Sequence, residues 1–349
     1  MVRSRSSGYE DMKRLNVAVV GATGLVGRKM LEVLEERKFP VADLRLLASA
    51  RSAGRIMKFN GREHTVRELG PGSFVGVQVA LFSAGAAVSK EYAPIAVRAG
   101  ALVIDNSSGF RMDEDVPLVV PEVNPLDIAK HNGIIANPNC STIQMVVALK
   151  PLHDRWKIRR LVISTYQSVT GAGKRAVSQL VSELANEPNP ERKFPHPIAM
   201  NVLPQIDVFL EGGYSREELK MKHETRKILG DESIRITATC VRVPVVGGHS
   251  EAVNVEFERP YDLDQLRKVL SETPGICVQD DVARSIYPMP IWSHEKDAVF
   301  VGRIRRDDSI PNGLNLWIVS DNLRKGAATN AVQIAEAWNE QRKASSKTG

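Results

Sequence analysis

Residues 15–27 read Leu15-Asn16-Val17-Ala18-Val19-Val20-Gly21-Ala22-Thr23-Gly24-Leu25-Val26-Gly27. The first six are typical of a buried strand, and apolar side chains recur at helical spacing from Leu25 onward. A strand, a glycine turn and a helix in this order are the context of a dinucleotide-binding fingerprint. The spacing is G-x-x-G-x-x-G, which still allows a tight turn and the close approach of a phosphate. We therefore expect a nucleotide at the helix N-terminus, although an ordinary tight turn is the alternative. The expected contacts are Gly21, Thr23, Gly24, Leu25, Val26 and Gly27.

The end of the next strand indicates which nucleotide binds. A strand over 44–48 precedes Ser49-Ala50-Arg51-Ser52-Ala53-Gly54. In NAD-binding folds an acidic residue at this place binds the ribose hydroxyls. These six residues contain no carboxylate, whereas Ser49, Ser52 and the guanidinium of Arg51 suit a 2′-phosphate. The stretch predicts NADP, and the alternative is an arginine that only faces solvent.

Further strands and helices alternate up to residue 136. Apolar runs at 77–82 and 102–105 predict two strands with a helix at about 89–98 between them, and 116–120 and 133–136 predict two more. Ser83, Ala84 and Gly85 follow the first run, and such small residues let a cofactor approach the backbone. Asn106 follows the second run, at a strand end where open α/β sheets place ligands. The pattern predicts an α/β Rossmann-type domain with a parallel sheet covered on both faces.

The hexapeptide Asn137-Pro138-Asn139-Cys140-Ser141-Thr142 leads from the last of these strands into a helical pattern over 142–149. Pro138 disfavours helical dihedrals at the residue before it, so the chain should turn there. Cys140 then lies near the first turn of a helix, where free N–H groups and the helix dipole favour a thiolate. Cys140 is therefore a candidate nucleophile, and the alternative is a small buried apolar residue.

Strands dominate beyond residue 149. The stretches 161–169, 234–241, 252–257, 300–305 and 313–319 have strand patterns, and 186–204 is rich in Pro and Asn and should be irregular. Helices are expected up to about 185, at 215–229, at 263–271 and at 326–341. Ser215 and Glu218 have the spacing of a capping box. The arrangement predicts an α+β domain with a largely antiparallel sheet.

Composition limits the possible functions. The chain has 349 residues, 43% of them hydrophobic, which suits two domains with a core each. The net charge is +6, and basic residues alternate with acidic ones, so nucleic-acid binding is not expected. No apolar run is long enough for a membrane span. The three cysteines and seven histidines lack the spacings of a disulfide framework or a metal cluster. We expect a cytoplasmic protein without a metal site.

The two ends of the chain are polar. Residues 1–14 should form a disordered arm and residues 343–349 a polar tail. The arm lacks the apolar core of a secretory signal. A plastid location would follow if the arm is the remnant of a transit peptide, and an artificial extension is the other explanation.

Several strings in this chain resemble those of the aspartate-β-semialdehyde dehydrogenase family. They are G-A-T-G-L-V-G, S-A-R-S-A-G, F-S-A-G, P-N-C-S-T, S-T-Y-Q-S-V-T-G-A-G and S-D-N-L-R-K-G-A-A, spread over residues 15–342. The resemblance implies reduction of aspartyl-β-phosphate by NADPH to the semialdehyde, with release of phosphate. It implies a thioester on Cys140. The pathway would be the biosynthesis of lysine through diaminopimelate, and of threonine, methionine and isoleucine.

The resemblance also implies two further catalytic residues. Gln167, in S-T-Y-Q, would orient the reacting acyl group; the alternative is a polar residue of the core. His249 lies in Arg242-Val243-Pro244-Val245-Val246-Gly247-Gly248-His249, which is similar to the family's R-x-P-x-x-x-x-H. It would be the acid/base group, because imidazole titrates near neutrality. A surface histidine in a glycine-rich loop is the alternative.

Substrate and cofactor contacts are implied in the same way. Arg242 would bind the substrate α-carboxylate, Glu217 its ammonium and Lys220 a phosphate, although the last two also have the spacing of a surface ion pair. Arg111 would be a second phosphate ligand, and Asn139 would bind phosphate or the acyl oxygen. Asn322 would lie near the nicotinamide, and Gly171 is a further expected cofactor contact.

These expectations define two domains and two alternatives. Residues 15–140 with 323–342 would bind NADP, and residues 141–322 would carry catalysis and dimerisation, in a homodimer or a dimer of dimers. One alternative is an N-acetyl-γ-glutamyl-phosphate reductase; Glu217 speaks against it, because an acetylated substrate has no ammonium. The other is a non-catalytic NADP-binding regulator, against which Cys140, Gln167 and His249 together speak.

Overall fold

The computed structural model describes residues 14–347, with side chains up to residue 343. The predicted arm, apart from Arg14, and the last two residues of the predicted tail lie outside this range. The structure divides into two compact units, Met1–Pro138 with Ala328–Gly349 as unit 1 and Asn139–Ala327 as unit 2. The domain boundaries expected from the sequence, after 140 and after 322, stay a prediction.

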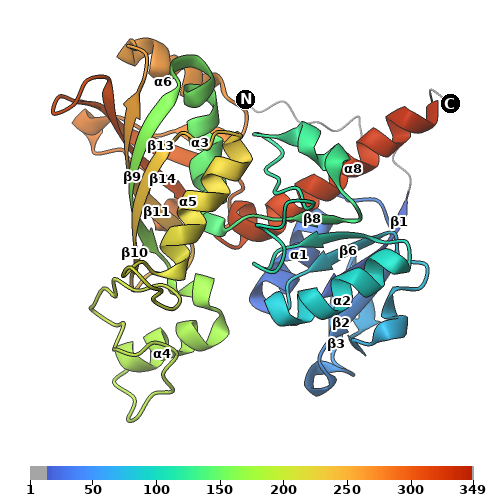
Figure 1. Cartoon of the computed structure of the whole chain (residues 1–349). Helices are drawn as coiled ribbons and strands as arrows, with labels where there is room; N and C mark the ends of the chain where they lie inside the picture. The colour runs from blue at the N-terminus through green and yellow to red at the C-terminus, as the bar shows by residue number, and fades with distance from the viewer. Residues whose placement is uncertain (1–13, 348–349) are drawn as a thin grey trace. The chain divides into compact units, whose positions relative to one another are not determined.

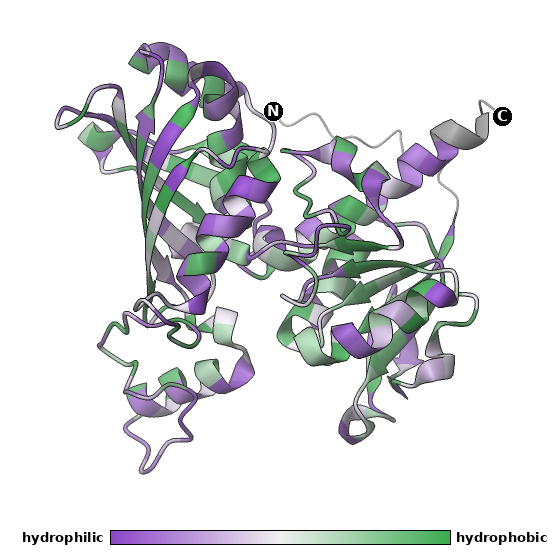
Figure 2. Ribbon diagram, viewed as in Figure 1, coloured by the Kyte–Doolittle hydropathy of each residue, from purple (hydrophilic) through white to green (hydrophobic). Residues whose placement is uncertain are grey.

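Unit 1 is built on a parallel sheet, as predicted (Figure 1). The strand order is β5-β2-β1-β6-β7-β8, and every neighbouring pair is parallel. The strands are β1 (Leu15–Val20), β2 (Val41–Ala48), β5 (Arg67–Glu68), β6 (Val79–Phe82), β7 (Leu102–Asp105) and β8 (Ile134–Ala136). The sheet is buried on both faces, so its strands are almost uniformly apolar. In Figure 2 they are largely green.

Two apolar clusters cover the sheet of unit 1. One contains side chains of α1 (Leu25–Glu36) and α8 (Thr329–Lys347), among them Met30, Leu34 and Ile334. The other contains side chains of α2 (Ala86–Arg98), among them Ala93 and Ala96. This is the doubly covered α/β arrangement expected from the sequence. Helix α8 continues to Lys347, so the predicted polar tail is helical up to that residue.

Unit 1 differs from the prediction at two places. The strand expected over 116–120 is wrong: Leu118 makes only an isolated bridge to Ala136. Pro117 lies within this stretch and Pro121 follows it, and proline cannot donate to a strand ladder. An antiparallel hairpin of β3 (Ile56–Phe59) and β4 (Arg62–Thr65) was not predicted, because its strands are only four residues long and mostly exposed.

Unit 2 contains a mixed sheet with the order β10-β9-β11-β14-β13-β12 (Figure 1). The three central pairs are antiparallel, as predicted, whereas β10 with β9 and β12 with β13 are parallel. The strands are β9 (Ile158–Gln167), β10 (Arg235–Arg242), β11 (His249–Phe257), β12 (Ile276–Val278), β13 (Val299–Asp307) and β14 (Gly313–Ser320). Strand β12 was not expected from the sequence.

Three helices form a layer on one face of this sheet: α3 (Cys140–Trp156), α5 (Arg216–Leu229) and α6 (Leu263–Glu272). Helix α4 (Lys174–Leu184) packs with Ile198 and Leu203 of the irregular segment predicted over 186–204. The remaining short elements are η1 (Ala50–Ser52), η2 (Pro71–Phe74), η3 (Pro125–Lys130), η4 (Val169–Ala172), η5 (Val282–Arg284), α7 (Pro290–Ser293) and the π-turn η6 (Arg324–Ala328). Within residues 14–347, no helix has the length and apolarity that crossing a membrane requires.

Candidate active site

Cys140 is the first residue of α3, which confirms the helix start predicted from the sequence. Asn139 is the N-cap, and its Oδ1 accepts hydrogen bonds from the backbone N–H groups of Ser141 and Thr142, at 3.0 and 3.2 Å. The helix start is held further by Glu224 of α5, whose Oε2 accepts from the backbone N–H of Asn139 at 2.6 Å. Since the cap positions the first turn, it also positions the Cys140 side chain.

Three of the expected site residues form a row across neighbouring strands of unit 2. Gln167, the last residue of β9, pairs in register with Arg242, the last residue of β10. His249 begins β11, which pairs with β9 on its other side. All three side chains are at least 95% buried. Gln167 thus meets two residues that lie at least 75 positions further along the chain, because three strand ends lie side by side. We call this set the upper row.

Only one ring nitrogen of His249 makes a hydrogen bond within the described residues. Its Nδ1 accepts a hydrogen bond from the backbone N–H of Ser168 at 3.0 Å. Its Nε2 is buried and has no hydrogen-bond partner among the described residues. In a neutral imidazole one nitrogen carries the proton, and an Nδ1 that accepts leaves that proton on Nε2. His249 therefore presents an unused N–H donor.

The expectation that His249 titrates near neutrality is corrected by its surroundings. Burial, and after it the charge of Arg242, lowers the pKa of His249 to about 3. The imidazole is therefore uncharged at neutral pH in this structure. A neutral imidazole with a free Nε2–H is suited to donate toward a developing oxyanion.

Glu217 is the centre of the polar network of the site. Its Oε1 accepts from the side-chain amides of Asn139 at 2.8 Å and Gln167 at 3.2 Å, and its Oε2 lies 3.1 Å from Nζ of Lys220. Burial alone would raise the pKa of Glu217, but Lys220 and the two amides outweigh it, and the pKa is lowered. Glu217 is 5% exposed, so the surface ion pair considered from the spacing is excluded.

Lys220 has a second anionic neighbour, which the sequence did not reveal. Its Nζ lies 3.1 Å from a carboxylate oxygen of Asp207. Burial disfavours the charge of Lys220, yet Glu217 and Asp207 together raise its pKa. Asp207 lies in the irregular segment before α5, where no pattern singled it out.

Arg242 is buried, and one of its N–H groups makes no hydrogen bond within the described residues. Its Nη1 donates to the carbonyl oxygen of Ser168 at 2.6 Å, and its Nε has no partner among the described residues. Burial lowers the pKa of Arg242, while the negative charge of Glu217 and, after it, the neighbouring Cys140 and Cys240 oppose that change. The guanidinium and the Cys140 sulfur are therefore within electrostatic reach of each other.

Two glycines make room around these groups. A Cβ on Gly171 would lie 3.0 Å from Nη1 of Arg242 and 3.2 Å from Nε2 of His249. A Cβ on Gly326 would lie 2.9 Å from Cβ of Cys140. Sequence reasoning missed Gly326 as a site residue, although it lies in the string S-D-N-L-R-K-G-A-A that supported the family resemblance.

Asn322 organises the chain around His249. Its Oδ1 accepts hydrogen bonds from the hydroxyls of Ser168 and Thr170, at 3.1 and 2.9 Å, and from the backbone N–H of Gly248 at 3.1 Å. Asn322 is 3% exposed. In this structure its side-chain oxygen fixes the turn after β9, and the expected nicotinamide contact stays a prediction.

The glycine turn of unit 1 has the geometry that a dinucleotide needs. A Cβ on Gly21, whose φ is +84°, would lie 2.9 Å from the carbonyl group of Ser83, and one on Gly27 would lie 2.2 Å from the oxygen of Gly21. Gly24 caps α1 without a side-chain hydrogen bond, and the first turn contains no acidic residue. The first N–H groups of α1, at Leu25, Val26 and Gly27, have no partner within the helix. The loop fits a pyrophosphate.

The residues expected around the 2′-phosphate lie together at the end of β2. Arg51 is in η1, exposed, and no hydrogen bond or ion pair engages it within the described range. Ser49 precedes η1, and the buried Ser52 hydroxyl accepts from Thr23 of the glycine turn at 3.4 Å. The arrangement therefore joins the glycine turn to the loop after β2.

Asn106 and Arg111 lie in the loop after β7. The guanidinium of Arg111 donates to the carbonyl oxygens of Asn137 and Asn106, both at 3.0 Å, and the side chain is 7% exposed. Asn137 donates from its amide to Oδ1 of Asn106 at 2.6 Å. Arg111 therefore holds the loops after β7 and β8, and its role as a phosphate ligand stays a prediction. Ser83, Ala84 and Gly85 follow β6, with Gly85 as the N-cap of α2.

One group of potential metal ligands occurs in the described part of the chain. A ring nitrogen of His294 and carboxylate oxygens of Glu295 and Asp321 lie within 4.8 Å of one another. Asp321 also accepts hydrogen bonds from the backbone N–H groups of Leu323 and Arg324, so it serves as a local cap. The expectation of no metal site stays a prediction.

Comparison with known proteins gives consistent matches over both units. A family model described as the NAD binding domain of semialdehyde dehydrogenase matches residues 16–131, and one described as its dimerisation domain matches residues 149–325. An aspartate-semialdehyde dehydrogenase of Aquifex aeolicus is 56% identical over 328 residues, which are 92% of this chain and 96% of that protein. One of Bacillus subtilis is 52% identical over 93% of this chain and 97% of that protein.

Solved structures agree with these matches. A crystal structure of aspartate semialdehyde dehydrogenase II from Vibrio cholerae has a TM-score of 0.90 at 52% identity and covers 93% of this chain and 98% of that chain. The same enzyme complexed with ASA gives a TM-score of 0.90 at 51% identity, with the same coverage. An aspartate semialdehyde dehydrogenase with NADP from Candida albicans has a TM-score of 0.73 at 28% identity, over 93% of this chain and 98% of that chain.

Proposed function

The chain belongs to the aspartate-semialdehyde dehydrogenase family, and from this premise we propose how its own residues carry out that family's reaction. The reaction is the NADP-dependent reductive dephosphorylation of L-aspartyl-β-phosphate to L-aspartate-β-semialdehyde. It belongs to the biosynthesis of lysine, threonine, methionine and isoleucine. Unit 1 is assigned to NADP binding, and unit 2 to catalysis and dimerisation.

The reaction begins at the N-terminus of α3. The thiolate of Cys140 attacks the carbonyl carbon of the acyl phosphate, a C–S bond forms, and the C–O bond to phosphate breaks. Phosphate leaves, and a thioester remains on Cys140. The bound NADPH supplies a hydride to the thioester carbon. When the C–S bond of the resulting thiohemiacetal breaks, the aldehyde is released and the thiolate is restored.

His249 donates a proton and later recovers it during these steps. Its Nε2–H is unused and its imidazole is neutral, so it donates to the oxygen on which negative charge develops. It recovers the proton when the thiohemiacetal collapses. Gln167, whose amide is held by Ser141 at 2.6 Å and by Glu217, orients the acyl group beside Cys140.

The charged residues select the substrate. Arg242 binds the α-carboxylate with the guanidinium donors that Ser168 leaves unused, and Glu217 binds the α-ammonium. Lys220 and Arg111 are assigned to phosphate, and Asn139 to phosphate or the acyl oxygen. The buried carboxylate of Glu217 favours a free ammonium over an acetylated nitrogen, which speaks against an N-acetyl-γ-glutamyl-phosphate reductase.

The position of Cys140 as the first residue of the capped helix α3 carries the proposal. Cys140→Ser should retain NADP binding and lose turnover of aspartate semialdehyde with phosphate by orders of magnitude, because an alkoxide is much harder to generate than a thiolate. Cys277→Ser is the matched control and should remain active. Mass spectrometry of the quenched protein should locate an acyl adduct on Cys140. An adduct on Cys240 or Cys277, or turnover by the serine variant, would refute the assignment, and wild-type protein without turnover would favour a regulator.

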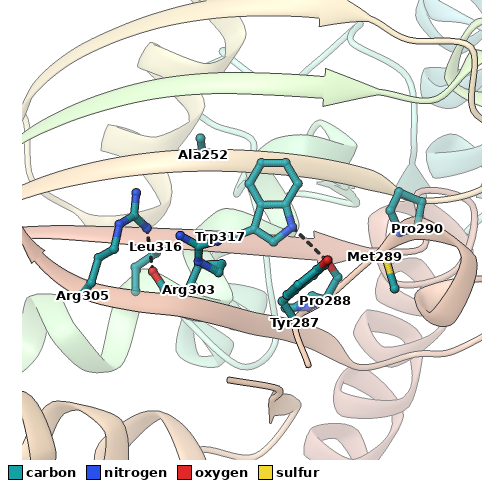
Figure 3. Close-up of a pocket in the computed structure, with 9 residues that line it drawn as sticks. All are labelled: Ala252, Tyr287, Pro288, Met289, Pro290, Arg303, Arg305, Leu316 and Trp317. Atoms are coloured by element: carbon teal, nitrogen blue, oxygen red, sulfur yellow. Dashed lines mark hydrogen bonds between the residues drawn. The ribbon is translucent and has the colours of Figure 1, made fainter. Parts of the chain in front are cut away.

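A homodimer formed through unit 2 is part of the proposal. Helices α3, α5 and α6 cover one face of the sheet, and the other carries half-buried or exposed side chains such as Tyr166 and Trp317, whose rings lie 5.5 Å apart. A pocket of about 370 Å³ opens on this outer face, and Trp317 donates to the carbonyl oxygen of Pro288 at 2.9 Å beside it (Figure 3). Aromatic and apolar side chains around a hollow are typical of association surfaces.

A cytoplasmic location is the last part of the proposal. Its support is the reducing environment that a thiolate nucleophile requires and the bacterial origin of relatives such as those of Aquifex aeolicus and Bacillus subtilis.

A further inference from the structure

Glu251 lies directly beneath the catalytic side chains, in a position that the reaction does not explain. On β11 it follows His249 by two residues, so both side chains point to the same face of the sheet. In register it lies opposite Thr165 of β9, which in turn pairs with Cys240 of β10. These three residues form a lower row, one pleat away from the upper row of Arg242, Gln167 and His249.

The lower row contains buried polar atoms without partners. Glu251 and Thr165 have no exposed surface, and neither the two carboxyl oxygens of Glu251 nor the hydroxyl of Thr165 has a well-formed hydrogen bond among the described residues. Oε1 of Gln144 in α3 is also buried and also lacks a well-formed hydrogen bond among the described residues. Buried polar groups are normally satisfied, so a set of such atoms in one place requires an explanation.

A single proton on Glu251 accounts for the two carboxyl oxygens and for Oε1 of Gln144. Ser141 and Gln144 are the side chains that act on the carboxyl group as hydrogen-bond partners, and both lower its pKa against the larger effect of burial. Ser141 already accepts from Gln167, so its own O–H is available to donate to the carbonyl oxygen of Glu251. Gln144 already donates from Nε2 to the carbonyl oxygen of His249 at 3.2 Å, so its Oε1 requires a donor. A protonated carboxyl can be that donor and can also accept from Ser141.

The surroundings of Glu251 favour the uncharged form. Burial raises its pKa well above the usual value, and no cationic side chain contributes to lowering it. The titratable neighbours are Cys240 in the same row, His249 on the same strand, and Glu217 and Glu218 of α5; burial, and after it the charge of Glu217, raises the pKa of Cys240. None of them supplies a positive charge at neutral pH.

We propose that Glu251 works as an uncharged carboxylic acid that joins Ser141 and Gln144 beneath the upper row, and is thereby a positioning residue for Gln167 and His249. The link runs from the amide of Gln167 through Ser141, Glu251 and Gln144 to the backbone oxygen of His249. It ties the first turn of α3, which carries Cys140, to the two strands that carry its partners. This inference rests on the proposed function, because it assigns those partners their work.

Two substitutions test the link through activity. Glu251→Gln retains one donor and one acceptor and should keep kcat within about threefold of wild type, whereas Glu251→Leu leaves Ser141 and Gln144 unpaired and should lower kcat about ten- to a hundredfold with a smaller change in KM. Glu256→Leu is the control, since Glu256 lies on the same strand and makes only longer ion pairs, 3.4 and 3.5 Å, with Arg159 and Arg235. A Gln variant as impaired as the Leu variant would show that the carboxylate is the working form and overturn the proposal.

A second readout does not depend on activity or on a folded Leu variant. A carboxyl group whose folded pKa lies above its unfolded value, about 4.3 to 4.5, binds more protons in the folded state, so it lowers stability as pH rises above that value. Glu251→Gln removes this dependence. The variant should therefore gain thermal stability relative to wild type between pH 5 and 8 on the order of a few degrees. Parallel melting curves against pH would overturn the neutral acid even if Cys140 proved to be the nucleophile.

Discussion

At the scale of a single residue, Asn139 makes separate hydrogen bonds with its backbone N–H, its side-chain oxygen and its side-chain amide. Its backbone N–H donates to Glu224, its side-chain oxygen caps α3, and its side-chain amide donates to Glu217. The same residue therefore fixes where the helix begins and how the carboxylate of Glu217 is held. Replacement by a similar acid, such as Asp, would remove the donor to Glu217 and place two negative charges together.

Gly326→Ala tests how closely the chain passes Cys140. The added Cβ would lie 2.9 Å from Cβ of Cys140, closer than such atoms approach, so the thiol must move. Overpacking of this kind costs about 1–3 kcal/mol, and we expect kcat and the rate of Cys140 alkylation to fall together. Gly72→Ala is the control, because a Cβ there meets nothing within 4 Å. An unchanged alkylation rate would show that the helix start adjusts without effect on the thiol.

Arg51→Ala tests the choice of cofactor. Arg51 is exposed at the end of β2, beside Ser49 and Ser52. Loss of a charge-assisted hydrogen bond to the 2′-phosphate should lower kcat/KM for NADP roughly ten- to a hundredfold and leave the value for NAD nearly unchanged. Arg55→Ala, at an exposed position four residues on, should alter neither value. If the ratio of the two cofactors does not change in the Arg51 variant, the guanidinium does not bind the phosphate.

Single residues show what a sequence can reveal about a site and what it cannot. Cys140 and the glycines of the first turn were identified because their chemistry depends on neighbours in the chain. The neutral state of His249 and the burial of Glu217 depend on strands that pair from distant parts of the chain. No local pattern determines that register, so those properties could not be predicted.

At the scale of elements, α5 has a well-defined start. The hydroxyl of Ser215 accepts from the backbone N–H of Glu218, and Oε2 of Glu218 accepts from the backbone N–H of Ser215 at 2.6 Å, the capping box predicted from the sequence. Oε1 of Glu218 accepts from the backbone N–H of Cys240 at 3.0 Å. The cap thus attaches the helix that carries Glu217 and Lys220 to strand β10.

Ser215→Ala should weaken this attachment. Loss of an N-cap costs about 0.5–2 kcal/mol, and we expect a lower melting temperature and a raised KM for the semialdehyde, since Glu217 lies in the first turn. Differential scanning calorimetry and steady-state kinetics measure the two effects. Ser271→Ala, at an exposed helical position in α6, should change neither. A melting temperature equal to that of wild type would mean that tertiary contacts alone hold the start of α5.

Helices and strands were predicted correctly where apolar residues recur at a regular spacing. They were missed where pairing with a neighbouring strand determines the structure. The amphipathic helices α5 and α6 were placed to within a residue or so, because one face of each is apolar. The short, mostly exposed hairpin β3–β4 and the three-residue strand β12 have no such pattern and exist because a neighbouring strand completes their hydrogen bonds. The stretch 116–120 had the pattern but contains no regular strand, because prolines interrupt it.

At the scale of the whole molecule, the outer sheet face of unit 2 provides a test of self-association. Tyr287 lines the pocket on this face and is 37% exposed. A buried charge without a partner is strongly disfavoured at an interface, so Tyr287→Asp should shift the protein from dimer toward monomer in analytical ultracentrifugation. Ile56→Asp, at an exposed apolar position of unit 1, should remain dimeric. A monomeric wild type would refute the dimer, and two dimeric variants would locate the interface elsewhere.

The division into units also determines when unit 1 can complete its fold during synthesis of the chain. The helix that completes one apolar cluster of unit 1, α8, follows the whole of unit 2 in the chain, and its Val332, Ile334 and Ala335 pack with Met30 and Leu34. A polypeptide leaves the ribosome from its N-terminus. The nascent nucleotide-binding unit therefore exposes part of an apolar face throughout the synthesis of the other unit.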